Sequence, residues 1–586
     1  MRTYPALKKL STSRLTTDVF VGLDKRLRAN AGAFANTENL TGDHYPLAAT
    51  RQRRGLVRTL TKWQGICALE KLYYVDSGTL YCDGQATAVT GLEDGEKQLV
   101  TFGAYVIVFP DGAYLNTVDA TDTGRINRLY GSTGSVTYAL CTVDGVTYSD
   151  NLTVSAEKPA NPKDGDYWLN TSGDRHGLYR YTAASDKWVS ELSVYVRIGA
   201  TGIGAGLKEG DGVTLSGITG PTSDAALKEQ LEFLNNTTII QAAGDDYIVV
   251  VGVIDRAYTQ TTGTVRADRE MPAVDYVVEC NNRLWGCRAG TEDGQTLNEI
   301  YASALGDFKN WRAYDSGVTG SYAVSVGTEG PFTGAIAYKG MPCFFKDDAV
   351  HKVYGDNPSN YQMQTTRCEG VLSGCAKTLV NVAGALMYVG RSGVQLFEST
   401  PQKADDQLEG MRFSAGAAGA VNGKYYLSVR DADRTWHLLT YDAENGMWYR
   451  EDGLKVRQFA RLGAELYGQG ADGKLWALMG TAGDMEGAVT WTAESADIGY
   501  DYPQHKYLSR YNIRMRMDAA ATCRMYVQYD GGVWEDKGTI EGTGRTRTAL
   551  LNVQPRRCDH MRVKLTGTGN AEIYSIDRIL AMGADG

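Results

Sequence analysis

Short apolar and aromatic runs, separated by polar turns, recur along most of the chain. One unit repeats: an apolar-aromatic strand, a polar turn and a second strand, as in LYYVDSGTLYCDG. The turns are rich in Asp and Gly, which suits tight hairpins between antiparallel strands. The seven copies of this unit lie at residues 72–84, 104–115, 282–305, 341–355, 385–398, 424–442 and 465–478.

The spacing of these copies distinguishes between all-β architectures. The later copies begin near 283, 341, 386, 425 and 466, with separations of 58, 45, 39 and 41 residues. Four-stranded propeller blades repeat every ~40–50 residues, whereas sandwich strands recur every ~8–12 residues without a longer period. We therefore expect an all-β fold with a six- or seven-bladed β-propeller. The count stays open because an N-terminal strand could close the last blade.

Three stretches depart from the repeat and indicate further units. Residues 145–200 alternate Tyr and Trp tightly, residues 200–222 are Gly-rich, and strands with long period-2 alternation begin near residue 500. The expected organisation is a basic N-terminal arm and first strand (1–62), first propeller blades (63–140), an inserted β-rich module with a Gly-rich connector (141–222), the remaining blades (223–498) and a C-terminal β-sandwich (499–586).

One helix is expected, over SDAALKEQLEFLNN (223–236), with Ser223 as its N-cap. Its apolar stripe consists of Ala226, Leu227, Leu231 and Leu234. In the sandwich, alternation predicts two buried rows, which are Ile513, Met515 and Met517, and Met561, Val563 and Leu565.

Charge is distributed unevenly along the 586 residues. The net charge is −9, yet residues 1–62 hold 12 Lys/Arg against 4 Asp/Glu, and the remainder holds 48 against 65. A basic terminus on an acidic body fits either contact with nucleic acid or docking onto an acidic neighbour or another copy. The ten cysteines form no CxxC pair, so free buried thiols are expected.

The N-terminus has no apolar signal-peptide core, and no apolar run approaches the ~18 residues of a membrane span. We therefore expect a protein made in a reducing cytoplasm, without a membrane span.

The segment FVGLDKRLRANAGAFANTENLTGDHYPLAATRQRRG (20–55) resembles the opening of a family of bacteriophage virion proteins. NNRLWGC…EIYASALGDFKNW (281–311) is similar to a blade motif of phage tail propellers, and DGDYWLNTS…LYRYTAASDKWV to small modules of tail fibres. The resemblance implies a tail nozzle or packaged-DNA stabilisation protein. Such a protein forms a homo-oligomeric ring, usually of six copies, below the portal and adaptor. It retains packaged DNA and passes it during ejection.

Two groups of residues are candidates for contacts. Arg51, Arg53, Arg54 and Arg58 follow the Tyr45-Pro46 turn and could make sequence-independent contacts with DNA or contacts within a ring. The aromatic residues of the insertion could form a permanent interface, stack on a host surface glycan or fill a small core. They are Tyr167, Trp168, Tyr179, Tyr181 and Trp188.

Catalytic patterns are not found in the sequence. RDADRTW and TEDGQT fail the Asp-box pattern of sialidases, the six histidines are isolated, and adjacent carboxylates such as Asp405 and Asp406 lie in turn-like stretches. We therefore expect a structural virion protein of the tail with no catalytic residue, metal or cofactor. A glycan- or receptor-binding tail or baseplate protein is the alternative, and a glycan hydrolase comes third.

Overall fold

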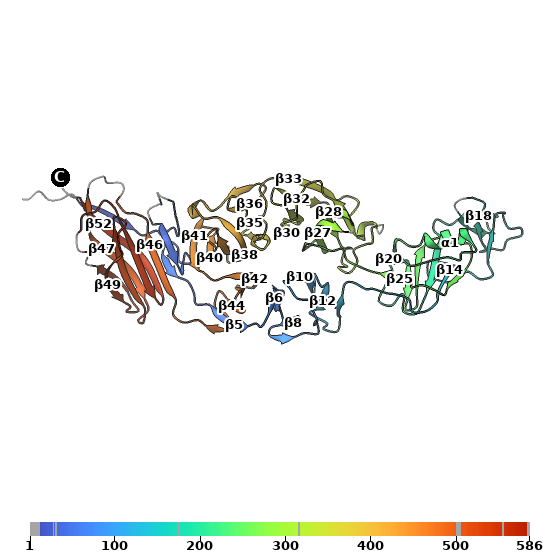
Figure 1. The fold of residues 1–586 in the computed structure, drawn as a ribbon, viewed down its shortest axis with the longest axis horizontal. Coiled ribbons are helices and arrows are strands. Elements are labelled where there is room, and N and C mark those ends of the chain that lie inside the picture. The colour runs from blue at the N-terminus through green and yellow to red at the C-terminus, as the bar shows by residue number, and fades with distance from the viewer. Residues whose placement is uncertain are drawn as a thin grey trace, which may run out of the picture.

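The computed structural model shows an all-β chain with one α-helix, α1 (Ala225–Glu232), in its described part. Three units follow one another along its length: a two-sheet sandwich, a central unit and an inserted unit (Figure 1). Neither α1 nor any other helix among the described residues is long and apolar enough to cross a membrane. The structure describes residues 12–26, 29, 32–173, 176–292, 294–314, 317–499, 505–551, 553 and 556–582.

The central unit contains seven antiparallel sheets, of which the first six are built from strands in chain order. The first three are β6 (Trp63–Ala68), β7 (Leu72–Asp76), β8 (Thr79–Cys82), β9 (Gln85–Ala86); β10 (Gln98–Phe102), β11 (Tyr105–Phe109), β12 (Ala113–Asn116), β13 (Thr123–Arg125); and β26 (Tyr276–Cys280), β27 (Arg283–Glu292), β28 (Gln295–Ala302), β29 (Tyr322–Ser325).

The next three sheets are β30 (Gly334–Tyr338), β31 (Met341–Phe345), β32 (Ala349–Tyr354), β33 (Gln362–Arg367); β34 (Val380–Val382), β35 (Ala385–Val389), β36 (Val394–Phe397), β37 (Pro401–Lys403); and β38 (Phe413–Val421), β39 (Lys424–Asp431), β40 (Trp436–Asp442), β41 (Met447–Asp452). The seventh is β42 (Val456–Leu462), β43 (Glu465–Gly470), β44 (Lys474–Ala477), β5 (Gly55–Thr59), β45 (Asp484–Met485).

Each of the seven sequence repeats forms the second and third strands of one of these sheets. The apolar runs are the most buried strands, since β35 and β43 are buried at every position. Tight turns join neighbouring strands. Asn422 and Gly423, both with positive φ, form the two-residue turn between β38 and β39, as a hairpin with matching twist requires.

A hydrophobic cluster lies between each sheet of the central unit and the next sheet. The first strands follow the same order: β6 contacts β10, β10 contacts β26, and β26 contacts β30. The order continues through a shared core to β34 and β38, then to β42, which contacts β6 again. In the seventh sheet the N-terminal strand β5 pairs with β44, so two segments more than 400 residues apart complete it.

The inserted unit extends from residue 136 to residue 268, further than the sequence indicates. Its main sheet has the order β22-β23-β19-β14-β24, beside a three-stranded sheet β21-β20-β25 and a small sheet β15-β16-β17-β18. Their bounds are β14 (Val136–Cys141), β15 (Leu152–Ser155), β16 (Tyr167–Asn170), β17 (Gly177–Thr182), β18 (Lys187–Ser190), β19 (Tyr195–Gly199), β20 (Gly212–Ser216), β21 (Thr237–Ile239), β22 (Ala242–Gly244), β23 (Tyr247–Val251), β24 (Tyr258–Gln260) and β25 (Arg266–Asp268).

Residues 223–268 therefore lie in the inserted unit, whereas the sequence places them with the blades. The physical reason is a shared core: Leu227 and Leu231 of α1 pack with Val136 and Ile248 of the main sheet. The helix is also shorter than expected. Its N-cap is Asp224, whose carboxylate accepts the Leu227 N–H at 3.1 Å, and not Ser223.

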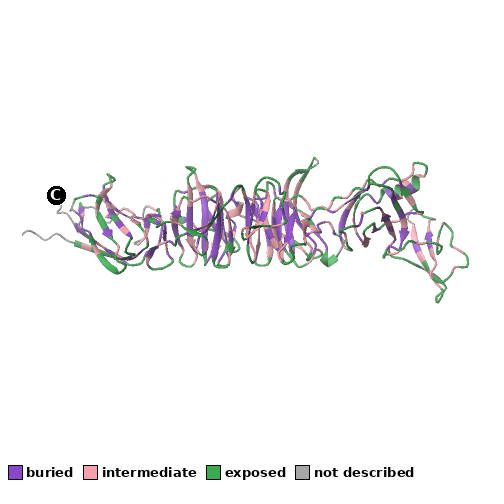
Figure 2. Ribbon diagram, turned by 90° about the horizontal axis from the view of Figure 1, so that it is seen from below, coloured by how far each residue is buried: buried purple, intermediate pink, exposed green. Residues whose placement is uncertain are grey.

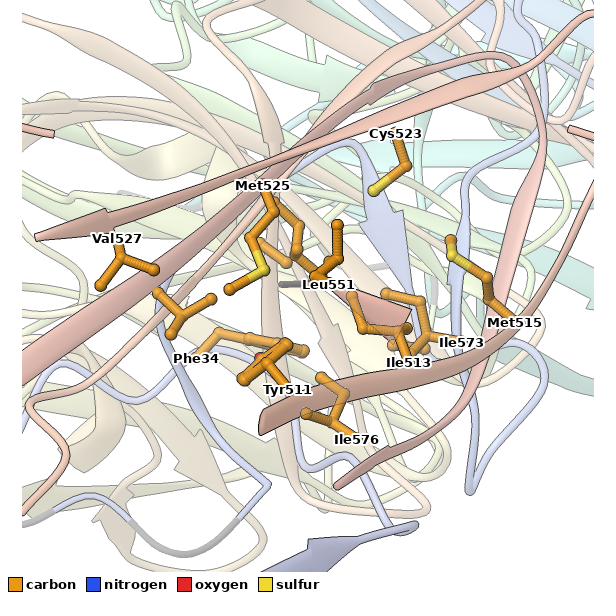
Figure 3. Packing of buried hydrophobic residues seen from close by; sticks show 14 of the residues in the cluster. Phe34, Tyr511, Ile513, Met515, Cys523, Met525, Val527, Leu551, Ile573 and Ile576 are labelled. Atoms are coloured by element: carbon orange, nitrogen blue, oxygen red, sulfur yellow. The ribbon is translucent and has the colours of Figure 1, made fainter. Parts of the chain in front are cut away.

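The sandwich packs two sheets face to face (Figure 3). The two expected rows, from Ile513 to Met517 and from Met561 to Leu565, are buried between the sheets, which confirms the alternation argument. One sheet contains β1 (Thr12–Thr17), β3 (Leu40–Thr41), β4 (Ala48–Thr50), β47 (Lys506–Met517), β50 (Thr546–Leu551) and β52 (Ala571–Met582), and the other β2 (Phe34–Glu38), β46 (Thr490–Ser495), β48 (Thr522–Tyr529), β49 (Glu535–Glu541) and β51 (Met561–Thr568).

The N-terminal segment is part of this sandwich and is not a separate arm over its described residues. β1 and β4 pair with β52, and β2 pairs with β46. Phe20 and Phe34 stack with ring centroids 5.7 Å apart inside the core. In each of the three units, the buried residues lie in the interior and the exposed residues at the periphery (Figure 2). The first and the last described strands, β1 and β52, therefore pair in the same unit.

Candidate functional sites

A buried ionic cluster joins the sandwich to the central unit. Arg54 donates to Glu451 Oε2 at 2.6 Å and to Asp452 Oδ2 at 2.7 Å, and Arg51 donates to Glu486 Oε1 at 2.5 Å. The arginines lie between β4 of the sandwich and β5 of the central unit. The carboxylates lie at the end of β41 and just after β45. We call these five residues the arginine junction.

Two carboxylates of the arginine junction, Asp452 and Glu486, have lowered pKa values because of the arginines beside them. Burial acts to raise the pKa of Asp452, but the guanidinium of Arg54 outweighs burial and lowers that pKa below its ordinary value. Burial likewise acts to raise the pKa of Glu486. The hydrogen bond from Arg51 and the backbone N–H of Arg54 outweigh it, and that pKa is also lowered. Removing one charge would therefore leave its partner buried and uncompensated.

Acid should weaken this junction. A carboxylate with a depressed folded pKa contributes stability above its ordinary pKa and loses it as pH falls through the folded value. The contribution of Glu486 should therefore be complete above its ordinary value of 4.5 and decline at lower pH. We expect wild type to exceed Glu486→Gln in free energy of unfolding at pH 7, with the difference closing towards pH 3. Urea denaturation over this range measures it, and a constant difference would contradict the assignment.

The structure places the four candidate arginines in two environments. Arg51 and Arg54 are 7% and 3% exposed and are paired with carboxylates. They therefore present no surface to DNA, and the sequence-based prediction of DNA contacts is wrong for these two residues. Arg53 is exposed and donates to the Glu486 carbonyl oxygen. Arg58 is exposed, donates to Tyr74 Oη at 2.8 Å and lies over the Tyr81 ring.

A polar contact spans the middle of the central unit. Lys377, just before β34, forms an ion pair with Glu96, just before β10. The sheets of β10 and β34 are not neighbours in either direction around the unit, so this pair bridges its interior. Gln458 of β42 donates to Glu96 Oε1 at 3.0 Å and accepts the Ile66 N–H at 3.0 Å. No local sequence signal identifies these residues, because they are hundreds of positions apart.

Four aromatic side chains gather on one face of the small sheet β15–β18. The strand register sets Trp168 opposite Tyr179, and Tyr181 opposite Trp188, and residues directly opposite project to the same side. Ring centroids are 5.3 Å apart for Trp168 and Tyr179, 5.8 Å for Trp168 and Trp188, and 5.5 Å for Tyr181 and Trp188. We call these four residues the aromatic face.

The other side of this sheet has a different role. Leu169 and Leu178 are buried in the core of the inserted unit, and Tyr167 packs against that core with its ring 4.7 Å from Tyr148. Of the five aromatic residues that the sequence indicates, four therefore belong to the aromatic face and Tyr167 to the core. No member of the aromatic face belongs to a hydrophobic cluster of the described residues.

The isolated histidines and adjacent carboxylates serve local structure. His351 is buried between the hydroxyls of Thr328 and Thr365, at 2.9 Å each, and burial lowers its pKa to about 4. Asp405 is buried and accepts the Val394 N–H at 3.0 Å, whereas Asp406 is exposed. Within the described ranges, no group of three or more His, Cys, Asp or Glu residues is placed to hold a metal ion.

Comparisons with known proteins give only distant structural neighbours. No protein-family model matches the chain, and no curated protein matches it. Solved structures with some similarity include an exo-beta-1,3-galactanase from Phanerochaete chrysosporium (9% identity, 52% of this chain and 94% of that one, TM-score 0.22). A glycoside hydrolase family 43 arabinoxylan arabinofuranohydrolase from Bacillus subtilis is similar at 9% identity, over 51% and 94% of the two chains, with a TM-score of 0.17. TM-scores this low support no inference about the present chain.

Proposed function

We propose that the central unit is a seven-bladed β-propeller closed by the N-terminal strand β5. Support comes from the seven antiparallel sheets, the hydrophobic cluster between each sheet and the next, and the return of the contact order from β42 to β6. Pairing of β5 with β44 joins the start of the chain to the last blade. Mixing early and late strands in one blade is one way to leave a ring of blades without an open seam.

We propose that the protein is a structural component of a bacteriophage tail. It would form a homo-oligomeric ring of six copies, as nozzle or tail-tube extension, next to the portal, adaptor or other tail proteins. The observation that carries this proposal is the position of the segment (20–55) that resembles phage virion proteins. Within that segment, Leu23 bonds to Trp448 and Arg51 and Arg54 belong to the arginine junction, so these residues join the sandwich to the central unit. A joint held by buried ion pairs suits a part that bears load.

The path of DNA in this proposal runs along the axis of the ring and not through a single copy. The Lys377–Glu96 pair spans the interior of the central unit. Two of the four candidate arginines are internal, so phosphate contacts would fall on exposed residues such as Arg53 and Arg58. Loose, sequence-independent contacts of this kind would let the genome slide during ejection.

Electron microscopy of the purified full-length protein tests this function. A closed ring with an axial hole, and immunogold labelling of the tail in phage particles, are the expected results. A protein that stays monomeric at high concentration and is absent from particles would overturn the proposal. Release of reducing sugar from polysaccharides would instead favour a glycan hydrolase.

A further inference from the structure

The aromatic face lies on the inserted unit, at the end of the molecule far from the sandwich (Figure 1). Trp168 is buried beneath its neighbours, and Tyr179, Tyr181 and Trp188 are half-buried with ring surface open to solvent. The small sheet buries Leu169 and Leu178 in the core on its other side, so the aromatic row faces away from that core. We propose that the aromatic face is a binding platform for a neutral saccharide chain.

The local backbone supports a flat platform. Gly177 precedes Tyr179 by two positions and lies on the same side of β17. A Cβ at Gly177 would lie 3.3 Å from the Tyr179 ring, so the missing side chain leaves room for the ring to lie over the sheet. Trp168 stacks below Tyr179 with an interplanar angle of 29° and its indole N–H bonded to the Ser155 carbonyl oxygen at 3.0 Å. Open aromatic rings with a fixed support suit the apolar C–H face of a pyranose.

Polar groups for sugar hydroxyls border the rings. Asp186 accepts the Tyr181 hydroxyl on Oδ1 at 2.6 Å, which leaves Oδ2 available. The Tyr181 hydroxyl donates this hydrogen bond and keeps its oxygen lone pairs as acceptors. A carboxylate oxygen and a tyrosine hydroxyl beside stacked rings are groups that vicinal hydroxyls of a sugar can bond to.

Charge and size favour a saccharide over other occupants. Residues 152–190 hold five Asp/Glu and five Lys/Arg, so the segment has no excess positive charge to attract the phosphates of nucleic acid. A second copy of the chain would need roughly 800 Å² per partner for a stable interface. Three half-buried rings supply far less than that, since a whole aromatic side chain buries about 150–250 Å². A sugar segment of two or three units fits the available surface.

Titration of the full-length protein with maltohexaose, cellohexaose and chitohexaose, followed by calorimetry and tryptophan fluorescence, tests the proposal. At least one of these neutral chains should bind, and Trp188→Ala should weaken that binding by about tenfold or more, because it removes a stacking ring. Trp188→Tyr, which retains a ring, should bind with an intermediate affinity. Phe233→Ala is the matched control, because its ring is 76% exposed in the same unit and off the aromatic face.

Several results would overturn the proposal. They are no binding of any of the three chains at millimolar concentration, equal binding by wild type and a folded Trp188→Ala protein, or binding of the oligonucleotide dT20 in preference to the sugars. Circular dichroism establishes that each variant is folded. This proposal is independent of the tail-ring function. Trp188→Ala should lose sugar binding and still form rings in electron micrographs, so the two proposals can fail separately.

Discussion

Replacing Arg54 by alanine is expected to lower the free energy of unfolding by about 3–5 kcal/mol, because it strands buried carboxylates without their partner. Glu451 and Asp452 both bond to the Arg54 guanidinium, and Glu451 is itself buried. Chemical denaturation followed by tryptophan fluorescence measures the change. The midpoint of the unfolding transition should move to a lower denaturant concentration.

The matched control is Arg53→Ala, one position earlier. Arg53 is exposed and bonds to a backbone carbonyl oxygen and to no carboxylate that the structure describes. Its replacement should change the free energy of unfolding by less than about 1 kcal/mol. Equal losses in the two variants would show that the junction contributes no more than ordinary surface contacts.

Replacing Gly22 by alanine should be the second most damaging change among those considered. Gly22 has φ of +77°, and a Cβ there would lie 2.3 Å from the Trp448 carbonyl oxygen. That oxygen accepts the Leu23 N–H at 2.6 Å, so it cannot retreat without breaking the contact that docks the N-terminal segment. The left-handed conformation alone costs an alanine roughly 1–2 kcal/mol, and the overlap adds to it. Thermal and chemical denaturation of the variant measure the sum.

Gly91→Ala separates these two contributions. Gly91 also has positive φ, +65°, but a Cβ there would meet no atom within 4 Å. Its variant should show the conformational cost alone and unfold with a clearly smaller loss than Gly22→Ala. If the two losses were equal, the close approach to Trp448 would have no energetic role.

Local pattern was sufficient to predict the inner strands of the central unit. Each aromatic repeat forms the two inner strands of one sheet, because alternation of side chains and turn chemistry are determined within about fifteen residues. The buried rows from Ile513 to Met517 and from Met561 to Leu565 were predictable for the same reason. The outer strands of each sheet, such as β9 and β37, are short and polar and leave little signal.

Long-range pairing was beyond the reach of the sequence. Arg51 and Arg54 were predicted to lie on a basic surface. Their carboxylate partners lie about 400 residues later in the chain, and no local sequence pattern indicates such a pairing. The strands of residues 12–50 read as an arm, since their partners β46 and β52 come from the other end of the chain. For the aromatic face, the sequence identified the residues but not the side of the sheet to which each belongs.

The pairing of early strands (β1 to β4) with late strands (β46 to β52) in one sandwich has a consequence for synthesis on the ribosome. Strands β1 to β5 emerge first, yet β52 and β44 emerge hundreds of residues later, so the early strands wait with unpaired edges. Open edges invite pairing with other chains. A chain that stops before β44 completes neither unit, and one that stops after β45 still lacks the late strands of the sandwich. Nascent chains would therefore depend on chaperone protection until the last strand is released, and truncated products would be marked for removal by their exposed strands.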